Sequence, residues 1–156
     1  MNRPLTTLKT ITATCIIVIG VWKAAAQDGN AQHMFRTFYQ QAVAGNADAQ
    51  VLVAMQYFKG SGVPQDPKEG VKWIQRAAIQ GHLGAQRTLS IMSQQGNDVV
   101  PKNLVLAYMW SDIASRTNDP AALRLRLGQI LLMTPEQIAL AKELASQFKP
   151  VKEGRD

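Results

Sequence analysis

A pattern of small and aromatic residues returns along this 156-residue chain with a period of 36 to 37 positions. The unit that begins at Ala47 and the next unit share six positions, the last two after one inserted residue: Ala49 and Ala85, Gln50 and Gln86, Gly60 and Gly96, Val63 and Val99, Trp73 and Trp110, Ala77 and Ala114. Residues 33–45 match the second half of the unit when the chain is shifted by 36 positions. A period in this range, with two helices per unit, is typical of an α-solenoid.

Each unit has the pattern of two amphipathic helices joined by a turn. The first helix has apolar residues on one side, at positions 49, 53, 54 and 57, and we expect Gln50, Gln56 and Lys59 to face water. The segment Gly60-Ser61-Gly62 predicts the turn that ends this helix, because glycine adopts left-handed backbone angles without strain. Asp66-Pro67 then predicts the cap and the first turn of the second helix.

Small residues, glycines and aromatic residues together define the unit: Ala49, Tyr57, Gly60, Gly62, Trp73, Ala77, Ala78 and Gly81, with Trp110 in the next unit. Their order resembles the Sel-one-like repeat, a branch of the tetratricopeptide superfamily. Residues 47–81 resemble one nearly complete repeat, and residues 84–118 a degenerate copy in which Ser93 replaces the tyrosine and Asp98 the second glycine. The resemblance implies a right-handed superhelix of helix pairs that acts as a protein-binding scaffold and has no shared catalytic residue.

Residues 1–26 have the pattern of a secretory signal peptide. Arg3 and Lys9 precede an apolar run over residues 11–22, and three alanines follow, so we expect cleavage after Ala26. The run is shorter than the roughly 20 residues of a comfortable membrane span, and an uncleaved N-terminal anchor is the alternative. The sequence thus predicts an exported protein, periplasmic or secreted, with no membrane span in the mature chain.

The composition argues against several functional classes. Without residues 1–26 the net charge falls to +3, since 17 − 3 = 14 Lys and Arg then stand against 11 Asp and Glu, and no basic cluster predicts nucleic-acid binding. The single cysteine, Cys15, lies in that segment, so the mature chain has no thiol nucleophile. Neither histidine, His33 or His82, has a cysteine or carboxylate at metal-ligand spacing. We therefore expect no metal, no cofactor and no catalytic residue.

Two capping helices are predicted after the second repeat, within residues 119–149. Asp119-Pro120 predicts the start of one, and Thr134 with Gln137 at capping-box spacing predicts the start of the other. They are similar to the C-terminal extension that often follows such repeats. The sequence thus predicts an all-α solenoid of about seven helices over residues 27–149, with a partial repeat over 33–45. Residues 150–156 show no periodicity and are predicted to be a disordered tail.

The first helices of a solenoid's repeats line its concave surface, where residues not used in stacking face a ligand. The repeat pattern assigns eight residues to this surface: Gln50, Met55, Gln56 and Lys59 in one repeat, and Gln86, Arg87, Ser90 and Gln94 in the next. Such an amide-rich, mildly basic surface suits an extended peptide or a loop of a partner protein. Trp73 and Trp110 share one phase of the second helix, so we expect both to fill the core.

These features predict a monomeric, non-enzymatic scaffold of the cell envelope that binds another protein. One alternative is an accessory subunit whose open solenoid end is covered by a larger envelope assembly, because roughly three repeats are usually needed for stability. Another is a cell-wall-related hydrolase of the cysteine-rich repeat type. The hallmark of that type is paired cysteines in every repeat, and the mature chain has none.

Overall fold

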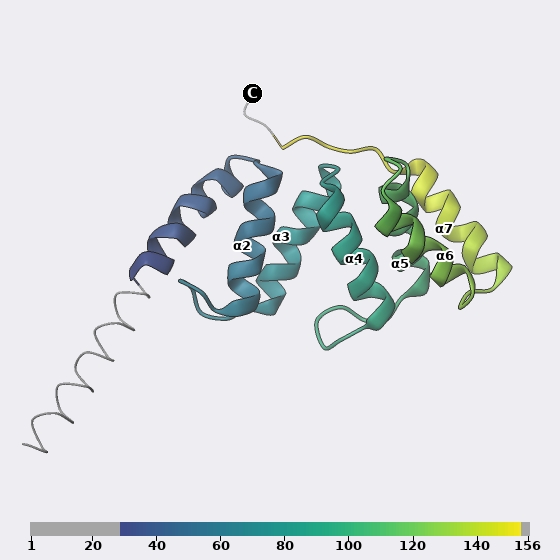
Figure 1. Cartoon of the computed structure of the whole chain (residues 1–156), viewed down its shortest axis with the longest axis horizontal. Coiled ribbons are helices and arrows are strands. Elements are labelled where there is room, and N and C mark those ends of the chain that lie inside the picture. The colour runs from purple at the N-terminus through teal and green to yellow at the C-terminus, as the bar shows by residue number, and fades with distance from the viewer. Residues whose placement is uncertain (1–28, 154–156) are drawn as a thin grey trace, which may run out of the picture.

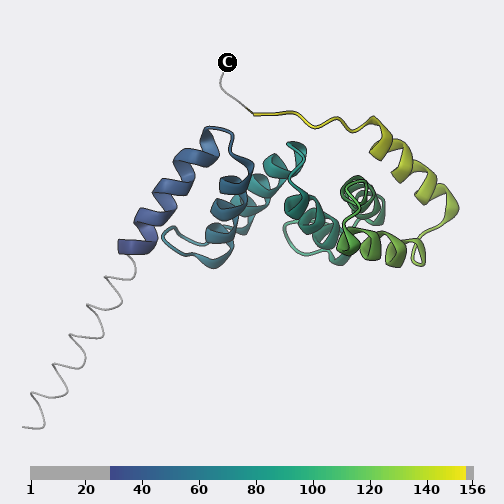
Figure 2. The same ribbon diagram turned by 45° about the horizontal axis from the view of Figure 1, so that its top comes forward.

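The computed structural model describes residues 29–153, and all regular structure in this range is helical. Residues 29–43 form the first helix, and six helices follow: α2 (Ala47–Lys59), α3 (Pro67–Ile79), α4 (Leu83–Gln95), α5 (Leu104–Ser115), α6 (Pro120–Ile130) and α7 (Pro135–Gln147). The helices follow one another along one axis, which confirms the predicted α-solenoid (Figures 1 and 2). The predicted signal segment, 1–26, lies outside the described residues.

A polar side chain begins each of the helices α2 to α7. Each accepts a hydrogen bond from a backbone N–H of the first turn, and these N-caps are Asn46, Asp66, His82, Asn103, Asp119 and Thr134. The predicted caps Asp66, Asp119 and Thr134 are confirmed, the last in a complete capping box with Gln137. Because first-turn amides have no partner within their helix, each cap stabilises its helix start by about 1 kcal/mol.

The turns that end each repeat use left-handed backbone. Gly45 and Gly81, one period apart, have φ angles of 93° and 94°, and Asn118 has a φ of 59° at the end of the second repeat. Glycine adopts this conformation freely, and asparagine tolerates it better than most residues. The 36-residue period is therefore present in the backbone as well as in the sequence.

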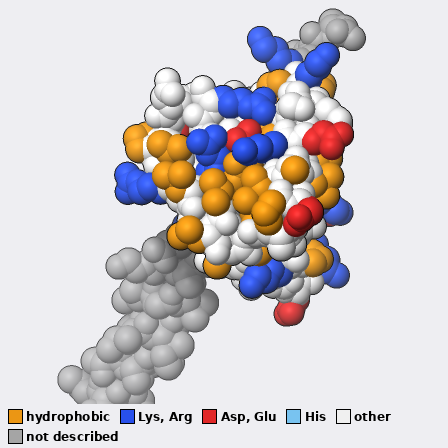
Figure 3. Space-filling model, turned by 90° about the vertical axis from the view of Figure 1, so that its right-hand side faces the viewer, with side chains coloured by type: hydrophobic (Ala, Val, Ile, Leu, Met, Phe, Trp, Pro, Cys, Tyr) orange, Lys and Arg blue, Asp and Glu red, His pale blue; other side chains and the backbone are white. Residues whose placement is uncertain are grey.

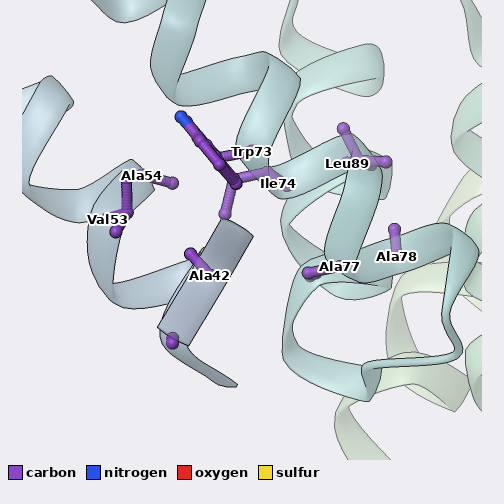
Figure 4. Close-up of a cluster of buried hydrophobic side chains, with 10 residues drawn as sticks. Ala42, Val53, Ala54, Trp73, Ile74, Ala77, Ala78 and Leu89 are labelled. Atoms are coloured by element: carbon purple, nitrogen blue, oxygen red, sulfur yellow. The ribbon is translucent and has the colours of Figure 1, made fainter. Parts of the chain in front are cut away.

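The hydrophobic core includes Trp73, whose side chain is only 6% exposed. Buried small and branched side chains from four consecutive helices belong to the same cluster: Ala42, Ala49, Val53, Ala54, Ile74, Ala77, Ala78, Ala85 and Leu89 (Figure 4). The alanines allow the helix backbones to approach, and the indole ring fills the space that remains. The prediction of a core residue is confirmed for Trp73, whereas Trp110 is only partly buried.

The chain after α7 departs from the sequence prediction. Residues 148–153, the C-terminal strap, leave α7 and return along one edge of the solenoid to α3 (Figures 1 and 2). The backbone N–H of Val151 donates to the carbonyl of Ile79 over 3.1 Å. Predicted disorder is therefore wrong for residues 150–153, and residues 154–156 lie outside the described range. Individual hydrogen bonds hold the strap in an extended conformation, and such contacts leave no periodic signal in the sequence.

Candidate functional site

Helices α4 and α6 enclose the α4–α6 groove, a surface hollow of about 540 Å³. Its walls are residues from the facing sides of the two helices: Gly84, Arg87, Thr88, Ile91 and Gln94 on α4, and Ala121, Arg124, Leu125 and Gly128 on α6. A Cβ atom built on Gly128 would meet nothing within 4 Å, so this wall stands away from other atoms. The groove combines an apolar floor with guanidinium, hydroxyl and amide groups, a mixture that suits an extended peptide.

An ion pair joins the two walls of the groove. Arg87 Nη1 lies 3.0 Å from Oδ2 of Asp119, which is also the N-cap of α6. Burial raises the pKa of Asp119, but hydrogen bonds from the N–H groups of Ala122 and Ala121 and the nearby Arg87 outweigh it and hold the pKa below its ordinary value. The Asp119 carboxylate is therefore ionised at neutral pH. Arg124 is exposed and adds a second positive charge to the groove.

Five of the eight residues predicted to face a ligand do reach the surface. Met55 and Lys59 are exposed, and Gln56, Arg87 and Gln94 are half-buried. Among these, Arg87 and Gln94 line the α4–α6 groove. Their part in binding a partner stays a prediction.

Gln50 and Gln86 are buried, so the prediction that they face a ligand is wrong. The Nε2 group of Gln50 donates to the carbonyl of Ala42, and that of Gln86 to the carbonyl of Ala78, each over 3.1 Å. Both glutamines lie in the first turn of a helix, beside the end of the preceding helix, where backbone carbonyls lack helical partners. The repeated glutamine therefore joins consecutive repeats by a buried hydrogen bond.

Ser90 is also buried, and its predicted exposure is wrong for a related reason. Its hydroxyl donates to the carbonyl of Ala107 over 2.8 Å and accepts from Nε2 of the buried Gln129 over 2.9 Å. Gln129 also donates to Gln94 Oε1 (3.0 Å) and accepts from the hydroxyl of Ser111 (2.7 Å). This network connects α4, α5 and α6 beside the groove and helps to set the spacing of its walls.

The eight predicted residues do not include Thr88, Ile91 and Arg124, which also line the groove. A signal for Ile91 was present, because Ile91 lies one period of 36 after Met55, which the repeat pattern did assign. Both side chains are exposed, at 48% for Met55 and 40% for Ile91. Arg124 belongs to α6, beyond the two matched units, so the repeat pattern could not have identified it.

A second surface lies at the C-terminal end of the solenoid. Figure 3 shows apolar side chains gathered on this face, with lysine and arginine side chains beside them. The exposed apolar residues of α6, α7 and their connection are Leu123, Leu127, Ile130, Leu131, Leu132 and Leu140. Leu131 is 86% exposed, which is high for a side chain of this type.

Within residues 29–153, no group of three or more histidine, cysteine, aspartate or glutamate side chains lies close enough to hold a metal ion. Over the same range, no helix combines the length and apolar character that crossing a membrane requires. His82 has a structural place: its Nδ1 accepts from the N–H of Ala85 over 3.0 Å, and its Nε2 lies 3.0 Å from the Asp48 carboxylate.

The family comparison agrees with the repeat boundaries seen in the structure. The family model described as Sel1 repeat matches residues 47–82 and 84–119, so each match covers one helix pair and the turn that follows it. This chain is a Sel1-like repeat protein. It belongs to the tetratricopeptide-like superfamily, as the sequence predicted. A comparison with curated proteins found no match.

Two solved structures are similar to this Sel1-like repeat protein. One is c5321, a protective antigen present in uropathogenic Escherichia coli strains displaying an SLR fold, with 27% identity and a TM-score of 0.67 over 73% of this chain. The chain spans 24% of that antigen's length. The other is a Sel1 repeat protein from Oxalobacter formigenes, with 22% identity, a TM-score of 0.58 and coverage of 73% of this chain and 90% of that one. The second likeness shows the fold alone.

Sel1 repeat proteins are generally protein-interaction scaffolds, and the fold is typically non-enzymatic.

Proposed function

We propose that this Sel1-like repeat protein is a non-enzymatic scaffold of the cell envelope that binds an extended segment of a partner protein in the α4–α6 groove. The groove itself is the principal support: it offers about 540 Å³ of open space between two first helices of successive helix pairs. Ile91 and Leu125 supply apolar contact, while Arg87, Arg124 and Gln94 supply donors for a peptide's carbonyl or carboxylate oxygens. Export to the envelope is supported by the signal-like pattern of residues 1–26.

Cross-linking in cells followed by purification of the tagged chain tests this proposal. The parent is compared with an Ile91→Glu, Arg124→Glu variant, which places two negative charges in the groove at exposed positions. A matched control, Leu52→Glu with Lys68→Glu, places the same charges on exposed positions of α2 and α3, away from the groove and from the end face. We expect a discrete cross-linked partner for the parent and the control and none for the groove variant. Equal recovery of that partner by all three would contradict binding in the groove.

Cell fractionation with N-terminal sequencing tests the envelope location separately. We expect the protein in the periplasmic or secreted fraction, with Gln27 as its first residue. A cytoplasmic protein that retains residues 1–26 would contradict export, and a membrane-fraction protein that retains them would indicate the N-terminal anchor.

The apolar end face favours a second candidate, an accessory subunit of a larger envelope assembly. The leucines of α6 and α7 expose the kind of surface that the next helix pair covers elsewhere in a solenoid. A Leu131→Glu, Leu132→Glu variant tests it, because loss of the partner from this variant, with retention by the groove variant, would place the contact at the end face. A hydrolase of the cysteine-rich repeat type lacks support, since Cys15 is the only cysteine in the sequence.

A further inference from the structure

The C-terminal strap ends in a cluster of three side chains, Gln50, Arg76 and Gln80, which we call the clamp. Arg76 Nε donates to both carboxylate oxygens of Glu153 over 3.2 Å, and Arg76 Nη2 donates to Oε2 over 2.6 Å. Gln50 Nε2 donates to the same Oε2 over 2.9 Å. One carboxylate thus accepts four hydrogen bonds from two side chains, in the forked geometry that makes arginine selective for carboxylates.

The clamp also contacts the backbone of the strap. Gln80 Oε1 accepts from the N–H of Glu153 over 3.2 Å, and Gln80 Nε2 donates to Gln50 Oε1 over 2.8 Å. Two residues earlier, the N–H of Val151 donates to the carbonyl of Ile79. Hydrogen bonds at alternate residues are typical of an extended segment bound along an edge. These hydrogen bonds therefore recognise an extended backbone and one glutamate side chain.

A glycine allows the strap to come this close. A Cβ atom built on Gly45 would lie only 1.9 Å from the carbonyl oxygen of Glu153, whereas Gly45 itself is buried beside the strap without a clash. Any side chain at this position would prevent the backbone of the strap from occupying its present place.

Little apolar surface holds the strap in the clamp. Residues 149–152 are all exposed, with Val151 at 58%, and the side chains of Arg76 and Glu153 are 39% and 33% exposed. Ion pairs this open to water contribute little to stability, and segments with few buried contacts open at low free-energy cost. The strap can therefore leave the clamp while the helices stay folded.

The clamp is absent from the second repeat. The positions that correspond to Arg76 and Gln80 are Ile113 and Thr117, whereas the buried glutamine recurs as Gln86. Gln86 makes the same bond to the preceding helix that Gln50 makes, so repeat folding requires the glutamine but not the arginine. The two residues specific to the clamp are Arg76, which binds the carboxylate, and Gln80, which accepts from the backbone N–H of Glu153.

We propose that the clamp is a binding site for an extended, glutamate-containing peptide segment of a partner protein, and that Glu153 occupies this site in the free protein. The site is distinct from the α4–α6 groove and shares no residue with it. The hydrogen bonds from Arg76 lower the pKa of Glu153 despite its partial burial, so the clamp favours the ionised carboxylate. A short tether gives the strap an effective concentration on the order of millimolar, and a partner's glutamate must compete with it.

A nuclear magnetic resonance titration of the full chain tests the proposal. The probe is a peptide with the sequence Phe-Lys-Pro-Val-Lys-Glu, blocked at both ends, and the signals followed are the side-chain N–H groups of Gln50, Arg76 and Gln80. We expect the peptide to shift these signals in a Glu153→Ala variant with at least tenfold higher apparent affinity than in the parent. A matched control, Glu143→Ala on the exposed face of α7, should behave as the parent does.

Two further comparisons separate recognition from a general change in the protein. A probe that ends in Gln instead of Glu should bind the Glu153→Ala variant at least tenfold more weakly. Adding Arg76→Lys, which keeps the charge but removes the guanidinium fork, should also weaken binding, with helix content checked by circular dichroism. Arg76→Ala is a less suitable choice because the guanidinium also lies 4.4 Å from the centroid of the Trp73 ring.

Several results would overturn the proposal. They are equal affinity in the parent and the Glu153→Ala variant, equal binding of the two probes, or shifts confined to the α4–α6 groove. A parent that sediments as a dimer, with a monomeric Glu153→Ala variant, would show that the strap serves a second copy of this chain. Shifts confined to the groove would support the groove as a peptide site, and the other results leave the groove proposal unchanged, so the clamp can fail while that proposal stands.

Discussion

The surroundings of the two tryptophans differ although the helices that carry them correspond. Trp73 contacts Tyr39 edge to face, with ring centroids 5.5 Å apart, and partly buried Phe35 and Tyr57 join the same cluster. One period later these three aromatic positions are held by Val71, Gln75 and Ser93. A hollow of about 450 Å³ lies there, lined by these three residues and Trp110 among others. The smaller side chains leave space that aromatic rings fill in the first repeat.

The strap compensates for part of this difference. Phe148 contacts Trp110 with the same centroid distance and the same 72° interplanar angle as Tyr39 and Trp73. Each repeat nevertheless forms a pair of helices, α2 with α3 and α4 with α5, because the N-caps, the repeat-ending turns and the repeated glutamine are retained. These local features therefore specify the solenoid, whereas the aromatic side chains around each tryptophan determine how well each repeat is packed.

The largest expected effect concerns the two tryptophans themselves. Trp73→Ala should destabilise the protein by about 3–5 kcal/mol, because it removes a buried ring from a filled core. Trp110→Ala should cost about 2 kcal/mol less, because its ring is partly in water and borders a hollow. Urea denaturation measures both changes. An equal or larger loss for Trp110→Ala would contradict the difference in packing.

The buried glutamines should give the next largest effect. Gln86→Ala leaves one interior carbonyl with fewer partners and should cost about 1–3 kcal/mol. Gln50→Ala should cost more, because Gln50 also bonds Gln80 and Glu153. Urea denaturation of each single variant, with and without Glu153→Ala, tests whether the strap explains the larger loss for Gln50→Ala. The difference in stability loss between Gln50→Ala and Gln86→Ala should be smaller in the Glu153→Ala background. An unchanged difference would mean that the contact with Glu153 does not account for it.

Substitutions in the repeat-ending turns should change stability by a smaller amount, and in opposite directions in the two repeats. Gly81→Ala should destabilise by about 1–2 kcal/mol through backbone strain alone, since the new Cβ would lie 3.6 Å from Pro150, an ordinary contact. Asn118→Gly should be neutral or slightly stabilising, because glycine adopts a φ of 59° without strain. Thermal melting compares the two variants. A tolerated Gly81→Ala would contradict the role assigned to this turn.

Filling the hollow should stabilise the second repeat slightly. Gln75→Tyr restores the residue type found one period earlier at Tyr39 and should raise stability by about 0.5–1.5 kcal/mol through ring contact with Trp110. Gln75→Leu is the matched control for apolar burial without a ring. A tyrosine variant no more stable than the leucine variant would show that the aromatic contact is not restored.

The smallest effect is a dependence of the strap on pH. Arg76 lowers the pKa of Glu153 below its ordinary 4.5, against the opposing effect of burial and with help from Gln50. Because the pKa is lowered in the folded protein, the stability that the Glu153–clamp contact contributes is complete above pH 4.5. This stability is lost as the pH falls through the lowered pKa. The Arg76 side-chain signal should report this release, and Glu153→Gln should remove the dependence. A transition above pH 4.5 would contradict the assigned sign.

The sequence predicted the fold well because its signals are local and repeated. Caps such as Asp66 and Thr134 and the turn residue Gly81 can be recognised from the few residues around them. The repeat period shows which positions correspond between the two repeats. Exposure was harder to predict. Gln50 and Gln86 look solvent-facing on a helical projection, yet each bonds a carbonyl of the preceding helix, a contact that depends on how two helices meet.

Contacts between distant parts of the chain could not be predicted at all. Arg76 and Glu153 are 77 residues apart, and neither belongs to a motif that suggests the other. Arg124 reaches the α4–α6 groove from a helix outside the matched units. In both cases the information lies in the three-dimensional course of the solenoid, whereas one sequence supplies only the order of its helices.

The strap also has a consequence for the order of folding. Helix pairs in a solenoid contact their neighbours along the chain, so they can form one after another as synthesis proceeds. The bond between Gln50 and Glu153 spans 103 residues and cannot form until the ribosome has added Glu153. Closing so long a loop is slow compared with forming local helix contacts. A nascent chain would therefore present its clamp open until residues 148–153 have been synthesised.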